Sequence, residues 1–201
     1  MKMNYASTHH NIPQNSQEWL DMRLGRFTAS SVKNLLMKPS TKGYQDEIKR
    51  VAFEKLTGTQ AETFSNEWME RGHALEDEAR SMYQVETFTV VDDGGFFTFG
   101  DTMGASPDGL IDDQGLVEIK CPKYTTIIDY LMEGEVPNIY YPQIQMQLLC
   151  SDRKWCDFVA YHPGLKLMIK RVEFDKEYCD GLIEVVEEAM KQVNIIIKTI
   201  K

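Results

Sequence analysis

The residues with the clearest chemical potential are two carboxylates and a lysine, in the order Asp108, Glu118 and Lys120. Glu118 and Lys120 are two residues apart in a β-branched stretch, so in a strand their side chains point to one face while Ile119 turns into the core. Asp108 belongs to the turn sequence 106–109, which would deliver its carboxylate from the edge of the same sheet. Two carboxylates suit Mg²⁺, and a lysine beside that ion could orient and help deprotonate an attacking water.

Each of these residues also has an ordinary structural interpretation. Ser-Pro-Asp-Gly is a common type I turn, and a Glu/Lys pair on a strand is often a solvated ion pair. A loose Asp…Glu-x-Lys pattern arises by chance about once in a chain of this length. Glu76 could pair with Arg80 one helical turn away, and Gln143 and Gln147 on one helix face could mark a solvent edge. Further sequence blocks are therefore needed to choose between a metal site and these structural roles.

The acidic charge of the chain is concentrated around these residues. The formal net charge is −9, and residues 76–120 hold 11 acidic against 2 basic side chains. Residues 1–75 hold 10 basic against 8 acidic ones. Crowded carboxylates repel one another unless each is solvated or they share a cation, so composition leaves both a solvated acidic face and a divalent-metal site open.

The elements expected to position these residues follow no regular alternation. Helices are predicted to begin near residue 16 and to cover residues 28–38, 44–56 and 66–83. Three strands follow at 87–91, 95–99 and 116–120, and then two helices at 125–133 and 137–149. Two more strands at 155–161 and 166–172 precede a last helix that begins at residue 175. This order predicts an α/β fold with a mixed central β-sheet flanked by helices. Residues 1–15 are expected to form a flexible N-terminal arm, and residues 16–201 a single domain.

Composition excludes several classes of protein. The chain has 201 residues, of which 42% are hydrophobic and 26% charged, which is typical of a globular protein and not of a disordered one. No apolar run approaches the ~20 residues that span a bilayer, and no secretory h-region is present, so we expect a cytoplasmic protein without a membrane partner. The four cysteines show no Cys-x-x-Cys spacing, which favours reduced thiols over a zinc site or a disulfide framework.

Five ordered blocks of sequence resemble one known family. They are Trp19…Arg23-Leu24-Gly25-Arg26-Phe27-Thr28-Ala29-Ser30, Gly72-x-x-x-Glu76, Ala105-Ser106-Pro107-Asp108-Gly109-Leu110, Glu118-Ile119-Lys120-Cys121-Pro122 and Tyr141-Pro142-Gln143-Ile144-Gln145. Together they cover roughly residues 16–162 and resemble the phage lambda-type (YqaJ-like) alkaline exonucleases of the PD-(D/E)xK superfamily. A joint chance match is implausible, unlike a match to the core motif alone.

The resemblance implies a restriction-endonuclease-like core and a Mg²⁺-dependent 5′-to-3′ exonuclease, with Mn²⁺ as a substitute metal. Such an enzyme digests one strand of linear double-stranded DNA from its ends and leaves 3′ single-stranded overhangs for recombination. The resemblance also implies a homotrimeric ring and a single-strand annealing protein as partner. Residues 16–201 would form the nuclease domain.

The resemblance also assigns roles to individual residues. Glu76, Asp108, Glu118 and the Ile119 carbonyl would hold the metal, Lys120 would activate the nucleophilic water, and Gln143 would steady that water or the lysine. Arg23 and Ser30 would bind the terminal 5′-phosphate, a task suited to a guanidinium fork and a hydroxyl at a helix start. Further expected DNA contacts are Arg26, Ser106 and Lys123.

Two alternatives of other kinds stay open at this point. The first is an endonuclease or repair nuclease of the same superfamily, including types with an iron–sulfur cluster, which need four convergent cysteines that this spacing does not predict. The second is a DNA-binding assembly protein that has lost its chemistry. All five predicted catalytic positions carry competent residue types, which speaks against the second alternative.

Overall fold

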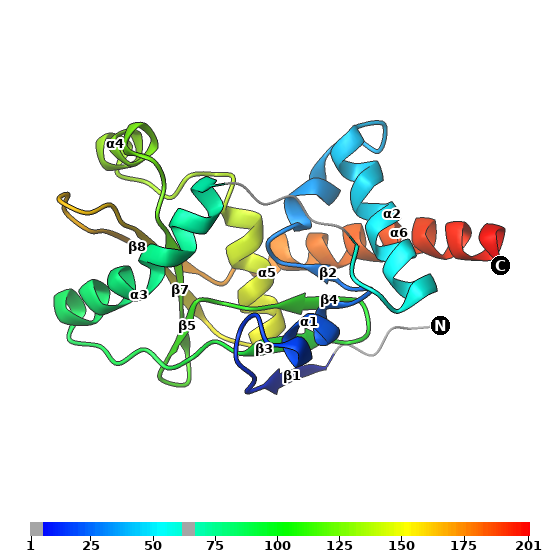
Figure 1. Cartoon of the computed structure of the whole chain (residues 1–201), viewed down its shortest axis with the longest axis horizontal. Coiled ribbons are helices and arrows are strands. Elements are labelled where there is room, and N and C mark those ends of the chain that lie inside the picture. The colour runs from blue at the N-terminus through cyan, green and yellow to red at the C-terminus, as the bar shows by residue number, and fades with distance from the viewer. Residues whose placement is uncertain (1–5, 62–66) are drawn as a thin grey trace.

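A computed structural model describes residues 6–61 and 67–201, without the side chains of residues 67–70 and 73. Its strands form two four-stranded sheets, and Figure 1 shows them next to each other with helices on their faces. This is the predicted α/β class with mixed sheets flanked by helices. The single central sheet expected from the sequence is, however, divided in two.

The first sheet has the strand order β1-β3-β4-β2. Its strands are β1 (Ser7–His10), β3 (Phe96–Phe99), β4 (Met103–Ala105) and β2 (Phe27–Thr28). β1 and β4 both pair with β3 in antiparallel orientation, and β2 runs parallel to β4. The predicted flexible arm over residues 1–15 is therefore wrong for residues 7–10, because their backbone is paired with β3; residues 1–5 lie outside the described residues.

The second sheet has the order β5-β6-β7-β8. Its strands are β5 (Gly109–Ile111), β6 (Gly115–Lys120), β7 (Trp155–Ala160) and β8 (Met168–Glu173). β6 and β7 are parallel, and the two outer strands are antiparallel to their neighbours. The predicted strands 95–99 and 116–120 thus belong to different sheets and are not adjacent.

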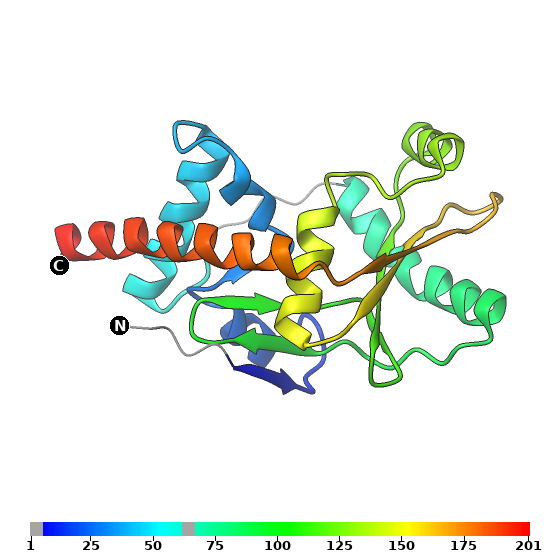
Figure 2. The ribbon, with the colours of Figure 1, turned by 180° about the vertical axis from the view of Figure 1, so that it is seen from behind.

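Helices cover both faces of the second sheet. The helices are α1 (Gln17–Arg23), the 3₁₀ helix η1 (Val32–Leu36), α2 (Lys42–Thr57), α3 (Glu67–Thr87), α4 (Tyr124–Glu133), α5 (Tyr141–Ser151) and α6 (Lys176–Ile200). Val117 and Ile119 of β6 pack with Ala79 and Tyr83 of α3 in one core cluster. Leu116 faces the other way, into the larger cluster that includes α5 and α6, which Figure 2 shows in front of the strands. β6 is therefore buried on both faces and can hold Glu118 and Lys120 rigidly.

Two predicted elements differ from the structure because long-range pairing outweighs local propensity. The expected helix over 28–38 begins as strand β2, since the N–H groups of Phe27 and Ala29 donate to carbonyls beside and within β4, and only η1 is helical. The expected strand 87–91 is absent from the described chain. There α3 continues to Thr87, and Phe88 then adopts a left-handed φ of 55°.

The structure also bears on the cysteines and on membrane-spanning segments. All four cysteines are free thiols, in agreement with their spacing. Among the residues that the structure describes, no helix combines the length and the apolar character needed to cross a membrane.

Candidate active site

One cavity of about 620 Å³ gathers most of the predicted site residues. Its lining includes Arg23, Ser30, Glu76, Ser106, Asp108, Glu118, Ile119, Lys120 and Gln143. Of the predicted residues, Arg26 and Lys123 do not belong to the described lining. The cavity therefore joins residues that are more than a hundred positions apart in the sequence.

Asp108 is fixed to the edge of β6 by its backbone and its side chain. Its N–H donates to the Val117 carbonyl at 3.1 Å, and its Oδ2 accepts from the Ile119 N–H at 2.6 Å. Arg80 of α3 also donates to the Asp108 carbonyl, at 2.5 Å. Burial raises the pKa of Asp108 well above its usual value, and the negative charges of Glu118 and Glu76 raise it further. This carboxylate is thus held where the free protein disfavours its charge.

Glu118 projects from the opposite face of β6 from Ile119 and is almost completely buried. Its Oε1 accepts from Gln143 Nε2 at 2.5 Å, and its Oε2 accepts from Gln147 Nε2 at 2.6 Å. Lys120 Nζ forms an ion pair with the same Oε1. Such a set of donors compensates the burial of the charge and fixes the orientation of the carboxylate.

Lys120 is a fixed cation in this arrangement. Burial lowers its pKa, but the carboxylates of Glu118 and Asp108 together outweigh burial and hold the pKa above its ordinary value. The ammonium also lies 5.5 Å from the ring centroid of Tyr140, which adds a cation–π contact. Lys120 is therefore protonated at neutral pH.

Gln147 is the site residue that sequence reasoning left without a role. The i,i+4 spacing of Gln143 and Gln147 predicts that both lie on one helix face, but this spacing alone favours a solvent edge over a site. In the structure both amides bind Glu118, and Gln147 is completely buried. The available signal was a pair of amides at helical spacing facing a predicted acidic strand.

Arg23 and Ser30 line the same cavity and come from α1 and the segment before η1. We call these two residues the basic wall of the cavity, and Asp108, Glu118 and Lys120 its carboxylate wall. The Arg23 guanidinium carbon lies 4.2 Å from the ring centroid of Trp19. Burial, followed by the positive charge of Arg50, lowers the pKa of Arg23 to about 10, so the group stays charged at neutral pH. Together with the exposed hydroxyl of Ser30 in the same cavity, this cation is suited to bind an anion.

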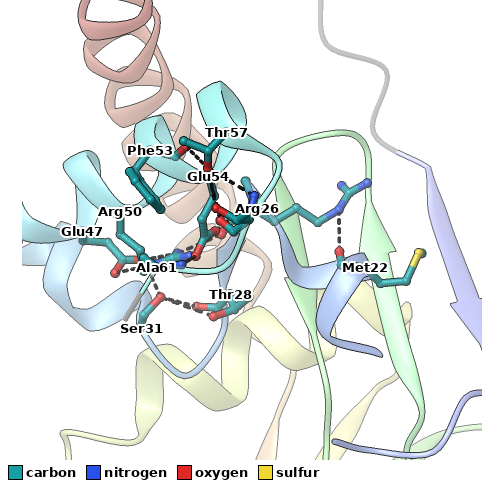
Figure 3. A network of polar contacts seen from close by, with 12 residues as sticks. Met22, Arg26, Thr28, Ser31, Glu47, Arg50, Phe53, Glu54, Thr57 and Ala61 are labelled. Carbon is teal, nitrogen blue, oxygen red and sulfur yellow. Dashed lines mark hydrogen bonds and ion pairs between the residues drawn. The ribbon is translucent and has the colours of Figure 1, made fainter. Parts of the chain in front are cut away.

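A buried ionic network supports the basic wall, as Figure 3 shows. Arg50 of α2 forms ion pairs with Glu47 at 2.7 Å and Glu54 at 2.8 Å. Glu54 Oε2 also accepts from the Gly25 N–H at 2.9 Å, and Glu47 Oε1 accepts from the Ser31 hydroxyl at 2.6 Å. The network therefore holds the segment 25–31 against α2. The contacts between this helix and the segment 25–31 were not predicted from the sequence.

The three further expected DNA contacts have different environments. Arg26 donates to the Gly100 carbonyl at 2.7 Å and to the Met22 carbonyl at 3.1 Å, so its guanidinium is engaged within the fold. Ser106 donates to the Gly95 carbonyl at 2.6 Å and accepts from Trp19 Nε1 at 3.0 Å. It thereby positions the ring that contacts Arg23. Lys123 is exposed at the N-cap of α4.

The carboxylates fit a hydrated divalent cation better than an all-protein cage. Among the side chains that the structure describes, no three Asp, Glu, His or Cys residues form a ready-made metal cluster. Asp108 and Glu118 nevertheless line one cavity with Glu76, and the mutual repulsion expressed in the Asp108 pKa would be relieved by a cation. Mg²⁺ commonly binds through one or two carboxylates and keeps several waters. The donor chemistry therefore fits Mg²⁺ or Mn²⁺.

Comparison with known proteins identifies the family of the chain. Residues 18–154 match the model of the YqaJ-like viral recombinase domain. The chain belongs to this family. The structure is also similar to the alkaline exonuclease LHK-Exo from Laribacter hongkongensis, with a TM-score of 0.84 and 34% identity over 92% of this chain and 96% of that one. The prediction of a nuclease that acts on DNA is thereby confirmed at the level of the family.

Two further comparisons complete this result. LHK-Exo in complex with dAMP gives a TM-score of 0.85 at 34% identity, with the same coverage of 92% and 96%. A phage-related exonuclease from Haemophilus somnus 129PT shares the fold, with a TM-score of 0.68 and 15% identity over 88% of this chain and 96% of that one. No curated protein sequence matches this YqaJ-like chain significantly.

Proposed function

We propose that this YqaJ-like nuclease is a Mg²⁺-dependent 5′-to-3′ exonuclease that digests one strand of linear double-stranded DNA. The product would be a duplex with 3′ single-stranded overhangs, suited to recombination by strand annealing. The single observation that carries the proposal is that one cavity is lined by carboxylates and Lys120 together with Arg23 and Ser30. In the proposed complex, the carboxylates and Lys120 would act on the scissile phosphodiester while Arg23 and Ser30 bind the terminal phosphate.

The carboxylate wall would carry out hydrolysis. Glu76, Asp108, Glu118 and the Ile119 carbonyl would hold Mg²⁺, or Mn²⁺ in its place, and the bound cation would polarise the phosphodiester and acidify a water. The Lys120 ammonium, aligned by Glu118, would orient the attacking water and stabilise the negative charge that develops on the phosphate. Gln143 would hold Glu118 and Lys120 in this alignment through its bond to Glu118 Oε1.

The basic wall would select the DNA end. A guanidinium held against Trp19 is preorganised, so a terminal 5′-phosphate would gain charge-assisted hydrogen bonds at little entropic cost. The Ser30 hydroxyl would add a further contact. In support of nucleotide binding at this fold, the similar LHK-Exo has been described in complex with dAMP.

We further infer that residues 16–201 act as one nuclease domain within a homotrimeric ring, with a single-strand annealing protein as partner. One 23.2 kDa chain cannot encircle a duplex, whereas a closed ring of copies can stay attached while nucleotides are removed. A trimer would have a formal charge of −27, three times that of one chain. Its channel must therefore be more basic than its exterior, and DNA affinity should fall steeply with added salt.

The test is a time course on linear duplex labelled separately at each 5′ and 3′ end, with and without Mg²⁺. The proposal predicts release of 5′-terminal nucleotides, survival of the complementary strand and no release without a divalent cation. Closed circular duplex should survive. Nicking of the circle would instead support an endonuclease. The absence of cleavage with both Mg²⁺ and Mn²⁺ would support a DNA-binding protein without nuclease activity.

A further inference from the structure

Gln147 is bound on one side of its amide only. Its side chain is completely buried in α5, and its Nε2 donates to Glu118 Oε2 at 2.6 Å. Its Oε1 is buried and has no hydrogen-bond partner among the described residues. Most buried polar atoms in native proteins have a partner, so such an oxygen indicates a missing water or ion.

The orientation of the Gln147 amide follows from the charge of its neighbour. A carboxylate can only accept hydrogen bonds, so the NH₂ group must face Glu118, and the carbonyl oxygen must point elsewhere. Rotating the amide by 180° would place two acceptors against each other. Gln147 lines the same cavity as Asp108 and Glu118, which makes water in that cavity the available donor for the carbonyl oxygen.

We propose that Gln147 is a positioning residue of the cation site. Its NH₂ group holds Glu118, and its carbonyl oxygen accepts a hydrogen bond from a cavity water that hydrates the divalent cation. The inference rests on the proposed metal-dependent function and extends it to a residue outside the predicted ligand set. Hydrogen bonds of this kind orient a ligand and tune the affinity of its metal.

The chain supplies a matched control two residues away. Gln145 is equally buried on the same helix, but both ends of its amide have protein partners. Its Nε2 donates to the Glu173 carbonyl at 2.8 Å, and its Oε1 accepts from the Asp175 N–H at 2.9 Å. Gln145 thus ties α5 to the turn between β8 and α6, a structural role away from Glu118.

The experiment is a Mn²⁺ titration of the full chain without DNA, followed by the electron paramagnetic resonance signal of free Mn²⁺. Gln147→Met keeps the length of the side chain and removes both polar groups, and Gln145→Met is the control. We expect Gln147→Met to weaken Mn²⁺ binding about 10- to 100-fold. Gln145→Met should lower the melting temperature while leaving the Mn²⁺ affinity within about two-fold of wild type.

The outcomes separate this inference from the function on which it rests. If wild type binds Mn²⁺ and folded Gln147→Met binds it equally well, Gln147 does not position the site, although the nuclease proposal stands. If wild type binds no Mn²⁺, both fail. Circular dichroism checks that each variant folds. If Gln147→Met does not fold, Gln147→Asn replaces it, because the asparagine amide is one methylene too short to reach Glu118. Steady-state kinetics should show a weaker apparent Mg²⁺ affinity for Gln147→Met or Gln147→Asn than for wild type.

Discussion

The two walls of the cavity are built in different ways. The carboxylate wall uses regular elements, because β6 is buried on both faces and α5 presents two amides at helical spacing. The basic wall uses a seven-residue helix, a two-residue strand and the irregular segment that follows that strand. Backbone regularity fixes the first wall, whereas the buried Glu47–Arg50–Glu54 network fixes the second. Under the proposed function, hydrolysis and end recognition would thus rest on separate supports.

The electrostatics of the two walls also differ in sign. On one wall, burial and neighbouring carboxylates raise the pKa of Asp108. On the other, burial and the charge of Arg50 lower the pKa of Arg23. Each wall therefore holds a charge that its surroundings disfavour, and a ligand of opposite sign would relieve it. A cation suits the first wall and a phosphate the second.

The largest expected effect belongs to the carboxylate wall. Lys120→Ala should reduce single-turnover cleavage by at least about 100-fold, because the ammonium acts on charge that develops in the transition state. Binding of duplex ends, measured by fluorescence anisotropy, should change by less than about three-fold. Residual cleavage within a few-fold of wild type would show that Lys120 is only an ion-pair partner of Glu118.

Asp108→Asn should also abolish cleavage, and it should remove Mn²⁺ binding measured by calorimetry. The neutral amide can still accept from the Ile119 N–H, so the turn should keep its conformation. Circular dichroism and thermal denaturation provide the check on folding. Unchanged metal affinity in this variant would reduce Asp108 to a turn residue.

An intermediate effect is expected on the basic wall. Arg23→Ala should reduce the preference for 5′-phosphate over 5′-hydroxyl ends by about 10-fold, the loss of one or two charge-assisted hydrogen bonds. Arg26→Ala is the matched control, since that guanidinium donates to backbone carbonyls within the fold. The ratio of kcat/KM for the two substrates measures the preference. An equal loss in both variants would point to a general charge effect.

The smallest effect on activity concerns the supporting network. Glu54→Gln keeps the shape of the side chain but leaves Arg50 with one carboxylate, so the free energy of unfolding should fall by about 2 kcal/mol. Denaturation in urea measures this loss. We expect the 5′-phosphate preference to fall two- to three-fold, with kcat on 5′-phosphate ends unchanged. A lower kcat would mean that the network also supports the carboxylate wall.

Much of the carboxylate wall was predictable because its geometry is local. Strand alternation places Glu118 and Lys120 on one face, and the Ser-Pro-Asp-Gly sequence around Asp108 predicts the turn before β5. Helical spacing likewise brought Gln143 and Gln147 to one side of α5. The choice between a site and a solvent edge needed the tertiary position of α5, which no local pattern encodes.

The basic wall and its sheet were harder to predict because their contacts are long-range. β1 and β2 pair with strands about 75 or more residues away, and a two-residue strand has no periodicity to detect. The i,i+3 and i,i+4 spacing of Glu47, Arg50 and Glu54 is typical of ion pairs on an exposed helix face. In the structure, both glutamates are instead buried against the segment 25–31. Their role depends on that packing.

The most direct test of separate walls is the affinity of wild type, Lys120→Ala and Arg23→Ala for 5′-phosphate and 5′-hydroxyl duplex ends. Ca²⁺ in place of Mg²⁺ keeps wild type and Arg23→Ala from digesting the DNA during fluorescence anisotropy. We expect that Lys120→Ala, although inactive in Mg²⁺, keeps the wild-type preference for the phosphate, and that Arg23→Ala loses most of it. Equal loss in both variants would contradict the division of the cavity into a wall for chemistry and a wall for end recognition.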